Sequence, residues 1–139
     1  MNFEIRKGMD GIDFKLVHSW LTTSYWSPGV SRERVEQAAR GSSLVLGAFS
    51  NDSLVGYCRI VSDRTTFAWI CDVWVDELAR GQGIAKAMVR AAISDPEHQA
   101  LRRWVLATKD AHELYKGCGF VPLPEPERWM VKLDLAKVK

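Results

Sequence analysis

Residues 72–93 decide the fold of this chain and read Asp72-Val-Trp-Val-Asp-Glu-Leu-Ala-Arg-Gly-Gln-Gly-Ile-Ala-Lys-Ala-Met-Val-Arg-Ala-Ala-Ile93. An apolar strand passes through a short acidic turn and a glycine-rich loop into a segment whose apolar residues recur at helical spacing. These residues are Ile84, Ala87, Met88, Ala91 and Ala92. One face of the predicted helix is therefore apolar, and we expect it to pack on a sheet.

The glycine-rich loop has the composition of a ligand-binding site. Gly81 and Gly83 lie where the chain enters the helix, and the lack of side chains there lets a ligand approach the backbone. The first N–H groups of a helix have no partner inside the helix, and the helix dipole places partial positive charge beside them. The loop therefore predicts an anion-binding site, above all for phosphate.

The spacing of the loop excludes two common phosphate motifs. No Gly-Lys-Ser/Thr follows at the distance that the P-loop requires. No third glycine follows Gly83 three residues on, and the last 56 residues hold no second βαβ half, so the dinucleotide fingerprint is also excluded. A nucleotide-phosphate binder of another fold remains an alternative that rests on the loop alone, and it predicts binding of ATP or NAD.

Two motifs together resemble one family. Arg80-Gly-Gln-Gly-Ile-Ala85, preceded by the apolar strand end Val73-Trp-Val75, is similar to the Arg/Gln-x-x-Gly-x-Gly/Ala pattern of the GCN5-related N-acetyltransferases (GNAT). Downstream, Leu106-Ala-Thr-Lys-Asp-Ala-His-Glu-Leu-Tyr-Lys-Gly-Cys-Gly-Phe120 resembles the family's strand, helix and Leu-Tyr-x-x-x-Gly-Phe ending. The resemblance covers at least residues 43–133. Thr108 stands where the family usually has Asn, and Thr can also cap a helix.

The resemblance implies an α/β (α+β) fold: one N-acetyltransferase domain over residues 1–139, with a mixed, mostly antiparallel central sheet of six or seven strands flanked by about four helices. Alternating and β-branched residues predict strands at 3–7, 43–49, 54–61, 66–75, 103–107 and 128–134. Helical patterns precede and follow them at 10–23, 31–39, from 84 onward and before Tyr115. Because a helix intervenes, the strand at 103–107 is expected to be parallel to its partner.

Composition limits the function further. The chain has 139 residues, 47% of them hydrophobic, which is enough for one core. It contains no apolar run long enough to span a membrane and no apolar signal-peptide core after Met1, so the sequence predicts a soluble, cytoplasmic protein. The net charge is +2 and the longest basic run is Arg102-Arg103, which disfavours nucleic acid as a partner.

The three cysteines are Cys58, Cys71 and Cys118. Their number is odd and their spacing is not that of metal ligands, so no metal site is expected. Structural thiols in a reducing compartment are the simpler interpretation.

The resemblance implies acetyl-CoA as the acetyl donor. In the family, the pantetheine arm pairs like an added strand with backbone groups that correspond to Val73, Trp74 and Val75, one of which can also polarise the thioester oxygen. The pyrophosphate is expected on the N–H groups of Arg80, Gly81, Gln82, Gly83, Ile84, Ala85 and Lys86. Arg80, Lys86 or Arg90 can add positive charge, although a solvated helix face explains the last two equally well.

The resemblance points to Tyr115 as the proton donor to the leaving thiolate, since a phenol is protonated at neutral pH. The alternative is a packed tyrosine that only donates a hydrogen bond to ligand. The general base is ambiguous, because Trp69 and Cys71 occupy the positions where some members carry Glu or His. Asp72 reaches the acceptor pocket only if its strand is bulged, and a structural hydrogen bond is the alternative. His112 is of a residue type that can serve as a general base, but a solvated helix position explains it.

The acceptor pocket is expected beside the first helix-loop-helix region. Trp20, Tyr25 and Trp26 are candidates for contact with substrate, the alternative being that they anchor the two helices. The predicted activity moves an acetyl group to a primary amine of a small molecule or peptide by direct transfer through a tetrahedral intermediate, without a covalent enzyme intermediate. A CoA-binding regulatory module without transfer activity is the second hypothesis. The late strand and the proline-rich loop at 122–126 are suited to a homodimer.

Overall fold

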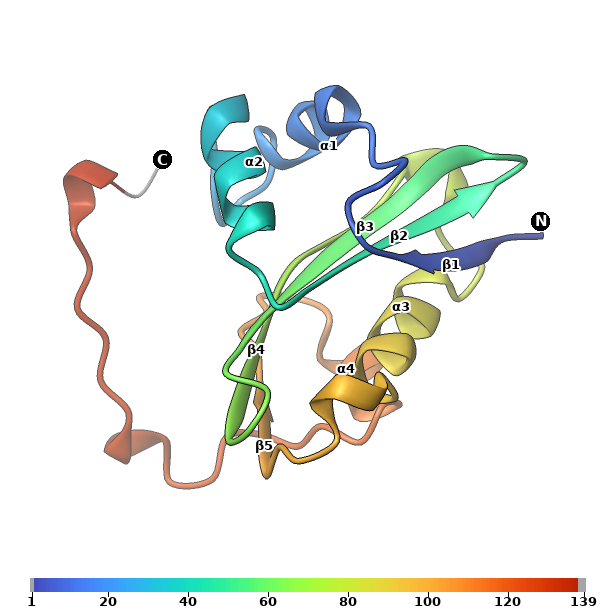
Figure 1. The fold of residues 1–139 in the computed structure, drawn as a ribbon. Coiled ribbons are helices and arrows are strands. Elements are labelled where there is room, and N and C mark those ends of the chain that lie inside the picture. The colour runs from blue at the N-terminus through green and yellow to red at the C-terminus, as the bar shows by residue number, and fades with distance from the viewer. Residues whose placement is uncertain (1, 138–139) are drawn as a thin grey trace.

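The computed structural model describes residues 2–137, and a five-stranded sheet in the order β1-β2-β3-β4-β5 forms its centre (Figure 1). The strands are β1 (Glu4–Lys7), β2 (Leu44–Ser50), β3 (Ser53–Ser62), β4 (Phe67–Val75) and β5 (Arg103–Val105). The first four pair antiparallel and β5 pairs parallel with β4. The mixed, mostly antiparallel sheet of the prediction is therefore confirmed, as is the parallel direction of the last pair.

Four α-helices accompany the sheet, as expected: α1 (Phe14–Leu21), α2 (Arg32–Arg40), α3 (Ile84–Ile93) and α4 (His112–Lys116). Single 3-10 turns occur at η1 (Glu77–Ala79), η2 (Pro96–His98), η3 (Pro126–Arg128) and η4 (Leu135–Lys137). Asp13 caps α1 and Ser31 caps α2, each by accepting a hydrogen bond from a first-turn N–H group at 3.2 Å. Such caps satisfy donors that the helix itself leaves unpaired. No helix within residues 2–137 combines the length and the apolar character that crossing a bilayer requires.

The helices cover the two faces of the sheet (Figure 1), with α1 and α2 on one side and α3 and α4 on the other. Successive strand residues point to opposite faces. Leu46 and Ala48 of β2 accordingly pack in the core beneath α3, whereas Val45 and Phe49 pack in the core beneath α1 and α2. Both faces of the sheet are thus buried.

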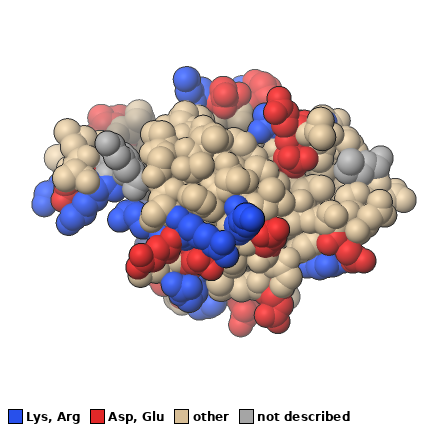
Figure 2. All heavy atoms as spheres, turned by 90° about the horizontal axis from the view of Figure 1, so that it is seen from above, with Lys and Arg blue, Asp and Glu red and all other residues tan. Residues whose placement is uncertain are grey.

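The prediction of six or seven strands is wrong: the sheet has five, and the strand expected last in the chain is missing from it. The segment 128–134, expected as a strand, forms none. It leaves the sheet beside β5 and runs outward along the side of the molecule (Figure 1), where it makes the projection at the left of Figure 2. Alternation of apolar residues shows that a segment is suited to be a strand, but a strand also needs a neighbour for its backbone groups. No strand within residues 2–137 runs beside this segment.

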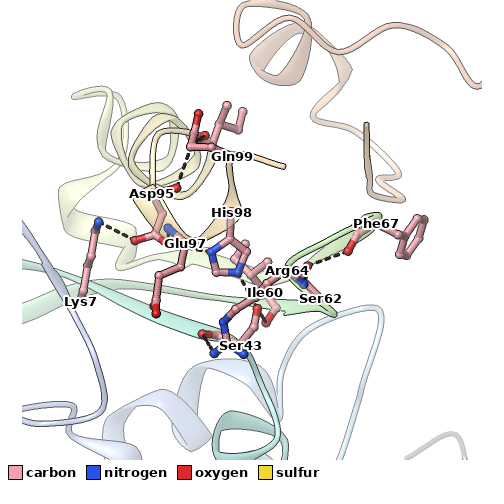
Figure 3. Close-up of polar contacts among 11 residues, drawn as sticks. Lys7, Ser43, Ile60, Ser62, Arg64, Phe67, Asp95, Glu97, His98 and Gln99 are labelled. Atoms are coloured by element: carbon pink, nitrogen blue, oxygen red, sulfur yellow. Dashed lines mark hydrogen bonds and ion pairs between the residues drawn. The ribbon is translucent and has the colours of Figure 1, made fainter. Parts of the chain in front are cut away.

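A buried polar network fixes the connection after α3 (Figure 3). His98 is 1% exposed; its Nδ1 lies 2.6 Å from Asp95 Oδ2 and its Nε2 lies 2.8 Å from Ser43 Oγ. Asp95 also accepts a hydrogen bond from Lys7 Nζ at 2.6 Å. Burial alone would raise the pKa of Asp95, but the hydrogen bonds from Lys7 and His98 lower it below its ordinary value. The network ties the end of α3 to β1 and to the start of β2.

Charged side chains are distributed over the surface in both signs. On the face that Figure 2 shows, basic and acidic groups lie interspersed between larger uncharged areas.

Candidate active site

Strands β4 and β5 separate after the first three residues of β4, and a cleft opens between them. They pair only at Phe67–Trp69 against Arg103–Val105. Beyond that point β4 continues to Val75 without a strand on this side, and the chain after β5 diverges towards α4. The space between them, about 550 Å³, is lined by residues 69–73 of β4, residues 106–111, Tyr115 of α4, and Tyr25 and Trp26 of the α1–α2 loop. We call it the central cleft.

A bulge in β4 turns Asp72 into the central cleft. Tyr57 of β3 lies opposite Trp74, but Arg59 lies opposite Cys71, so β4 holds one residue more than β3 over this stretch. Asp72 has a φ of +54°, in the left-handed region that residues other than glycine rarely adopt. The bulge that the sequence interpretation required is present, and Asp72 and Cys71 both line the cleft.

Two hydrogen bonds hold the carboxylate of Asp72. Arg59 Nε donates to Oδ2 at 2.6 Å, and Trp26 Nε1 donates to Oδ1 at 2.8 Å. The side chains of Arg59 and Asp72 are 18% and 14% exposed, so this is a largely buried ion pair, and such a carboxylate needs partners of this kind. The contacts join β3, β4 and the α1–α2 loop at one wall of the central cleft.

The α1–α2 loop closes the cleft with aromatic rings. Tyr25 and Trp26 meet edge to face with ring centroids 5.0 Å apart, and Trp26 lies 6.1 Å from the ring of Trp74. The Tyr25 hydroxyl accepts a hydrogen bond from the backbone N–H of Lys109 at 2.8 Å, on the opposite wall. Trp20 is 8% exposed and packs in the core under α1 and α2. Of the three aromatic candidates, the structure brings Tyr25 and Trp26 to the cleft and leaves Trp20 outside it.

Tyr115 is the ionisable group of α4 that reaches the cleft. Its side chain is buried and packs edge-on against Phe120, with centroids 5.9 Å apart. Burial raises the pKa of Tyr115 to about 12, so the phenol keeps its proton at neutral pH. Burial likewise raises the pKa of the Cys71 thiol to about 11, which leaves little of the nucleophilic thiolate. His112 is exposed on the outer part of α4 and does not line the central cleft.

The glycine-rich loop presents free backbone donors, and this fits a pyrophosphate group. Gly81 and Gly83 have φ values of +82° and +81°, and a Cβ added to either would meet no atom within 4 Å. The first N–H of α3 with a backbone acceptor belongs to Ala87, which donates to Gly83 at 3.0 Å. Within residues 2–137 the N–H groups of residues 81–86 have no such acceptor. An open surface with several free N–H donors at a helix N-terminus is suited to bind an anion.

The basic side chains near this loop are engaged elsewhere. Arg80 Nε donates to the Val75 carbonyl at 3.0 Å. Arg90 donates to the Gly117 carbonyl at 3.4 Å, and Lys86 Nζ lies against the same glycine. These contacts attach the loop to β4 and α3 to α4. The anion-binding capacity of the loop therefore comes chiefly from the backbone of residues 81–86.

The remaining predicted positions contribute through their backbone or their packing. Ile84 is 2% exposed, so its side chain belongs to the core. Val73, Trp74 and Val75 lie on the edge of β4 that β5 leaves unpaired, and Val73 lines the central cleft. Thr108 Oγ1 accepts a hydrogen bond from Ala111 N at 3.1 Å and so caps the turn before α4. Residues 2–137 contain no group of three His, Cys, Asp or Glu side chains arranged to hold a metal ion.

Sequence reasoning missed Arg59 and Lys109. Arg59 had a usable signal, because it is a charged residue inside a predicted apolar strand and Asp72 is another, of opposite sign, in the next strand. Two such charges on neighbouring strands favour a pair. Lys109 reaches the site through its backbone N–H, for which the sequence carries no signal.

Comparison with known proteins agrees with this geometry. The family model described as "Acetyltransferase (GNAT) family" matches residues 13–120. Among curated protein sequences, none matches the chain.

Solved structures share the whole architecture. A GNAT-family protein from Xanthomonas campestris pv. campestris is 33% identical, covers 97% of this chain and 96% of its own, and superposes with a TM-score of 0.88. A GNAT-family protein from Streptococcus pneumoniae is 21% identical over 96% of this chain and 98% of its own, with a TM-score of 0.73. A predicted acetyltransferase from Clostridium acetobutylicum, solved with acetyl-CoA, is 17% identical over 98% of both chains, with a TM-score of 0.68. The last two likenesses concern the fold alone.

Proposed function

This chain belongs to the acetyltransferase (GNAT) family, and from that premise we propose that it transfers the acetyl group of acetyl-CoA to a primary amine of a small molecule or peptide. Acetyl-CoA is the acetyl donor of the family. The observation that carries the proposal is the meeting of the neutral phenol of Tyr115 and the carboxylate of Asp72 at one cleft. The strand β4, which lines this cleft, leads into the loop whose N–H groups, at residues 81–86, are free.

Backbone groups would hold the donor, which supplies an acetyl group activated as a thioester. The residues concerned are Val73, Trp74 and Val75 on the free edge of β4, and Arg80, Gly81, Gln82, Gly83, Ile84, Ala85 and Lys86 around the N-terminus of α3. A free strand edge pairs with an extended chain through alternating N–H and C=O groups. An N–H group of this edge can also donate to an oxygen that gains charge during transfer.

Tyr115 holds a proton where a leaving thiolate needs one. Because burial raises its pKa to about 12, the hydroxyl is protonated throughout the physiological range and needs no further activation as a donor. The side chain lines the central cleft, as do residues 69–73 of β4.

Asp72 and the aromatic rings suit a cationic amine. The carboxylate orients the ammonium group or takes its proton through water, and the faces of Tyr25 and Trp26 attract positive charge. Cys71 lines the same cleft, but its raised pKa of about 11 argues against an acetyl-cysteine intermediate. Direct transfer to the amine is therefore the route we favour.

A CoA-binding module without transfer activity is the second candidate. It is favoured by the presence of Trp69 and Cys71 where a base would stand, and by the two hydrogen bonds that already occupy Asp72. A protein of this kind would bind acetyl-CoA and release no thiol with any amine.

Thiol release from acetyl-CoA distinguishes the two candidates. The protein is incubated with acetyl-CoA and a panel that contains aliphatic amines, aromatic amines, amino acids and peptides with a free N-terminus. We expect amine-dependent release from at least one class, reduced in the Tyr115→Phe variant. Binding of acetyl-CoA without release across the panel would select the regulatory module.

We also propose that the protein acts in the cytoplasm as a homodimer. All three cysteines are free thiols in the structure, in keeping with a reducing compartment.

A further inference from the structure

A second cavity lies between α2 and the strands β3 and β4, on the face of the sheet that α1 and α2 cover (Figure 1). Its volume is about 530 Å³. The apolar part of its lining comes from the two helices and the loop between them, and consists of Leu21, Val30, Val35 and Ala38. We call it the α2 cavity. An aliphatic or aromatic portion of a ligand can pack against such a lining.

One layer of side chains separates the α2 cavity from the central cleft, because Trp26, Arg59 and Asp72 line both. The Asp72 carboxylate joins this layer by accepting hydrogen bonds from Trp26 at 2.8 Å and from Arg59 at 2.6 Å. A molecule bound at these three side chains therefore contacts both spaces. An acceptor whose amine lies beside Asp72 has the α2 cavity as the space for its other end.

The two spaces differ in charge. The lining of the central cleft contains two basic and two acidic side chains, which balance. The lining of the α2 cavity contains three basic side chains, Arg34, Arg59 and Lys137, and one acidic side chain, Asp72. Arg59 pairs with Asp72, and Lys137 pairs with Asp134 at 3.3 Å. Arg34 is left as the uncompensated positive charge of this cavity.

Two guanidinium groups in the α2 cavity have donors to spare. Arg34 forms no ion pair within residues 2–137. Arg59 gives its Nε to Asp72 and lies 3.5 Å from Ser42 Oγ through Nη1, whereas its Nη2 has no hydrogen-bond partner in the described chain. Guanidinium groups bind carboxylate and phosphate through two N–H donors at once. The α2 cavity is therefore suited to an anionic group.

We propose that the amine acceptor of this protein carries an anionic group, a carboxylate or a phosphate, and that Arg34 and Arg59 bind this group in the α2 cavity. This inference rests on the proposed function, because it names the class of amine that the same site takes. The amine lies in the central cleft beside Asp72, and the apolar lining of the α2 cavity contacts the part of the acceptor that follows. The ion pair of Arg59 and Asp72 thus presents one charge to each end of the acceptor.

The anionic group takes no part in the transfer itself. The amine nitrogen bonds to the acetyl carbon and the C–S bond breaks. Of the two protons that the ammonium group loses, one is balanced by the proton that the CoA thiol gains and the other passes to solvent. Because the anion contributes binding alone, it should lower KM and leave kcat nearly unchanged.

Matched amines that differ by one anionic group test the proposal on the full chain. The pairs are phenylalanine with phenethylamine, γ-aminobutyrate with propylamine, and phosphoethanolamine with ethanolamine. Calorimetry in the presence of CoA measures binding, and thiol release from acetyl-CoA measures transfer. We expect the anionic member of at least one pair to bind about tenfold more tightly than its neutral partner, or better. The carboxylate and phosphate pairs show which of the two groups is recognised.

Arg34→Gln removes the uncompensated charge at an exposed position of α2, where the fold does not depend on it. The dissociation constant of the preferred anionic amine, and its KM in the transfer assay, should rise by about tenfold. The values for the neutral partner should stay as in the wild type. Arg32→Gln is the matched control, because Arg32 lies on the same helix, pairs with Glu36 and does not line the α2 cavity. It should change neither value.

Three results would overturn the proposal. The first is the absence of an anionic preference in every pair. The second is an anionic preference that survives Arg34→Gln, because another group would then bind the anion. The third is an equal loss of affinity for both members of a pair in this variant, because Arg34 would then act through the fold.

Failure of the proposed function gives a different result. Binding of an anionic amine that depends on Arg34, without thiol release, would retain the anion site and reject acetyl transfer. Thiol release with the neutral amines alone would support acetyl transfer and reject the anion site.

Discussion

Arg59 Nε and Asp72 Oδ2 lie 2.6 Å apart, at the point where the register between β3 and β4 slips by one residue. The slip gives Asp72 its positive φ, and the ion pair fixes its carboxylate at the wall of the central cleft. Backbone strain of this kind costs of order 1–3 kcal/mol and persists where surrounding contacts enforce it. Observed strain beside a cleft is a reason to look for function at that residue.

Replacing Asp72 tests this relationship directly. Asp72→Asn keeps the shape of the side chain and removes its charge, so we expect amine transfer to fall by about 10²- to 10⁴-fold with little change in acetyl-CoA affinity. Steady-state kinetics and a binding titration measure the two effects. Asp76→Asn, at the next carboxylate along the chain, is the control. Wild-type turnover in Asp72→Asn would mean that the carboxylate has only a structural role.

Tyr115→Phe removes the proposed proton donor. Turnover should fall by about 10²-fold or more, whereas the affinity for acetyl-CoA should stay near that of the wild type. Tyr57→Phe is a matched control, because the Tyr57 hydroxyl is buried and has no hydrogen-bond partner in the described chain. Equal turnover in the two variants would show that Tyr115 is not the proton donor.

The pH dependence follows from the same residue. The raised pKa of about 12 means that the protonated, donating form of Tyr115 persists as the pH rises from 7 to 10. Deprotonation of Tyr115 should therefore cause no fall in the rate of transfer between pH 7 and pH 10. The wild type and Tyr115→Phe should have the same shape of pH–rate profile over this range. A basic limb near pH 8 that disappears in the variant would contradict the assignment.

Gly83→Val should abolish binding of acetyl-CoA. The substituted side chain would stand in the open space over the loop, where the anion is expected, and a positive φ costs a residue with a Cβ about 1–2 kcal/mol. Gly8→Val is the matched control, since Gly8 has a φ of +98° with nothing within 4 Å of its added Cβ. Both variants should lose similar stability in thermal unfolding, but only Gly83→Val should lose the ligand in calorimetry. Retained binding would exclude the loop as the anion site.

Asp95→Asn tests the network that anchors the end of α3. Loss of the charged hydrogen bonds to Lys7 and His98 should lower the free energy of unfolding by about 2 kcal/mol, with Asp10→Asn, at an exposed position, as the control. Because the folded-state pKa of Asp95 is depressed, its contribution is present above the unfolded pKa near 4 and is lost as the pH falls through the folded value. The wild type should thus lose more stability below about pH 4 than Asp95→Asn; parallel pH curves would show that the network contributes nothing.

Much of the fold was predictable because each element carries a local signal. Alternation predicted the five strands that the structure has. Residues 128–134 carry the same alternation, yet they form no strand within the described chain. Alternation of apolar residues shows which segments are suited to be strands. Which strand lies beside a given segment depends on contacts between residues far apart in the sequence, and local alternation does not contain that information.

The candidate site likewise has features that the sequence predicts and features that only the structure reveals. Gly81 and Gly83 led to the prediction of an anion-binding loop, and the structure gives both the positive φ that favours glycine. The opposite charges of Arg59 and Asp72 on neighbouring strands favour a pair, but the sequence does not show the register slip of one residue that sets the geometry of this pair. Trp20 and Trp26 were indistinguishable by type, and only the packing of α1 placed one in the core and the other at the cleft.

The most direct measurement is a thermal-shift titration with acetyl-CoA, CoA, ATP and NAD in parallel. A ligand at 100 times its dissociation constant adds about 2.7 kcal/mol to folding stability, which raises the melting temperature of a domain of this size by several degrees. We predict a rise with acetyl-CoA and with CoA and none with NAD. A cooperative melt that neither CoA species shifts would contradict the central claim that the free β4 edge and the loop at 81–86 form an acetyl-CoA site.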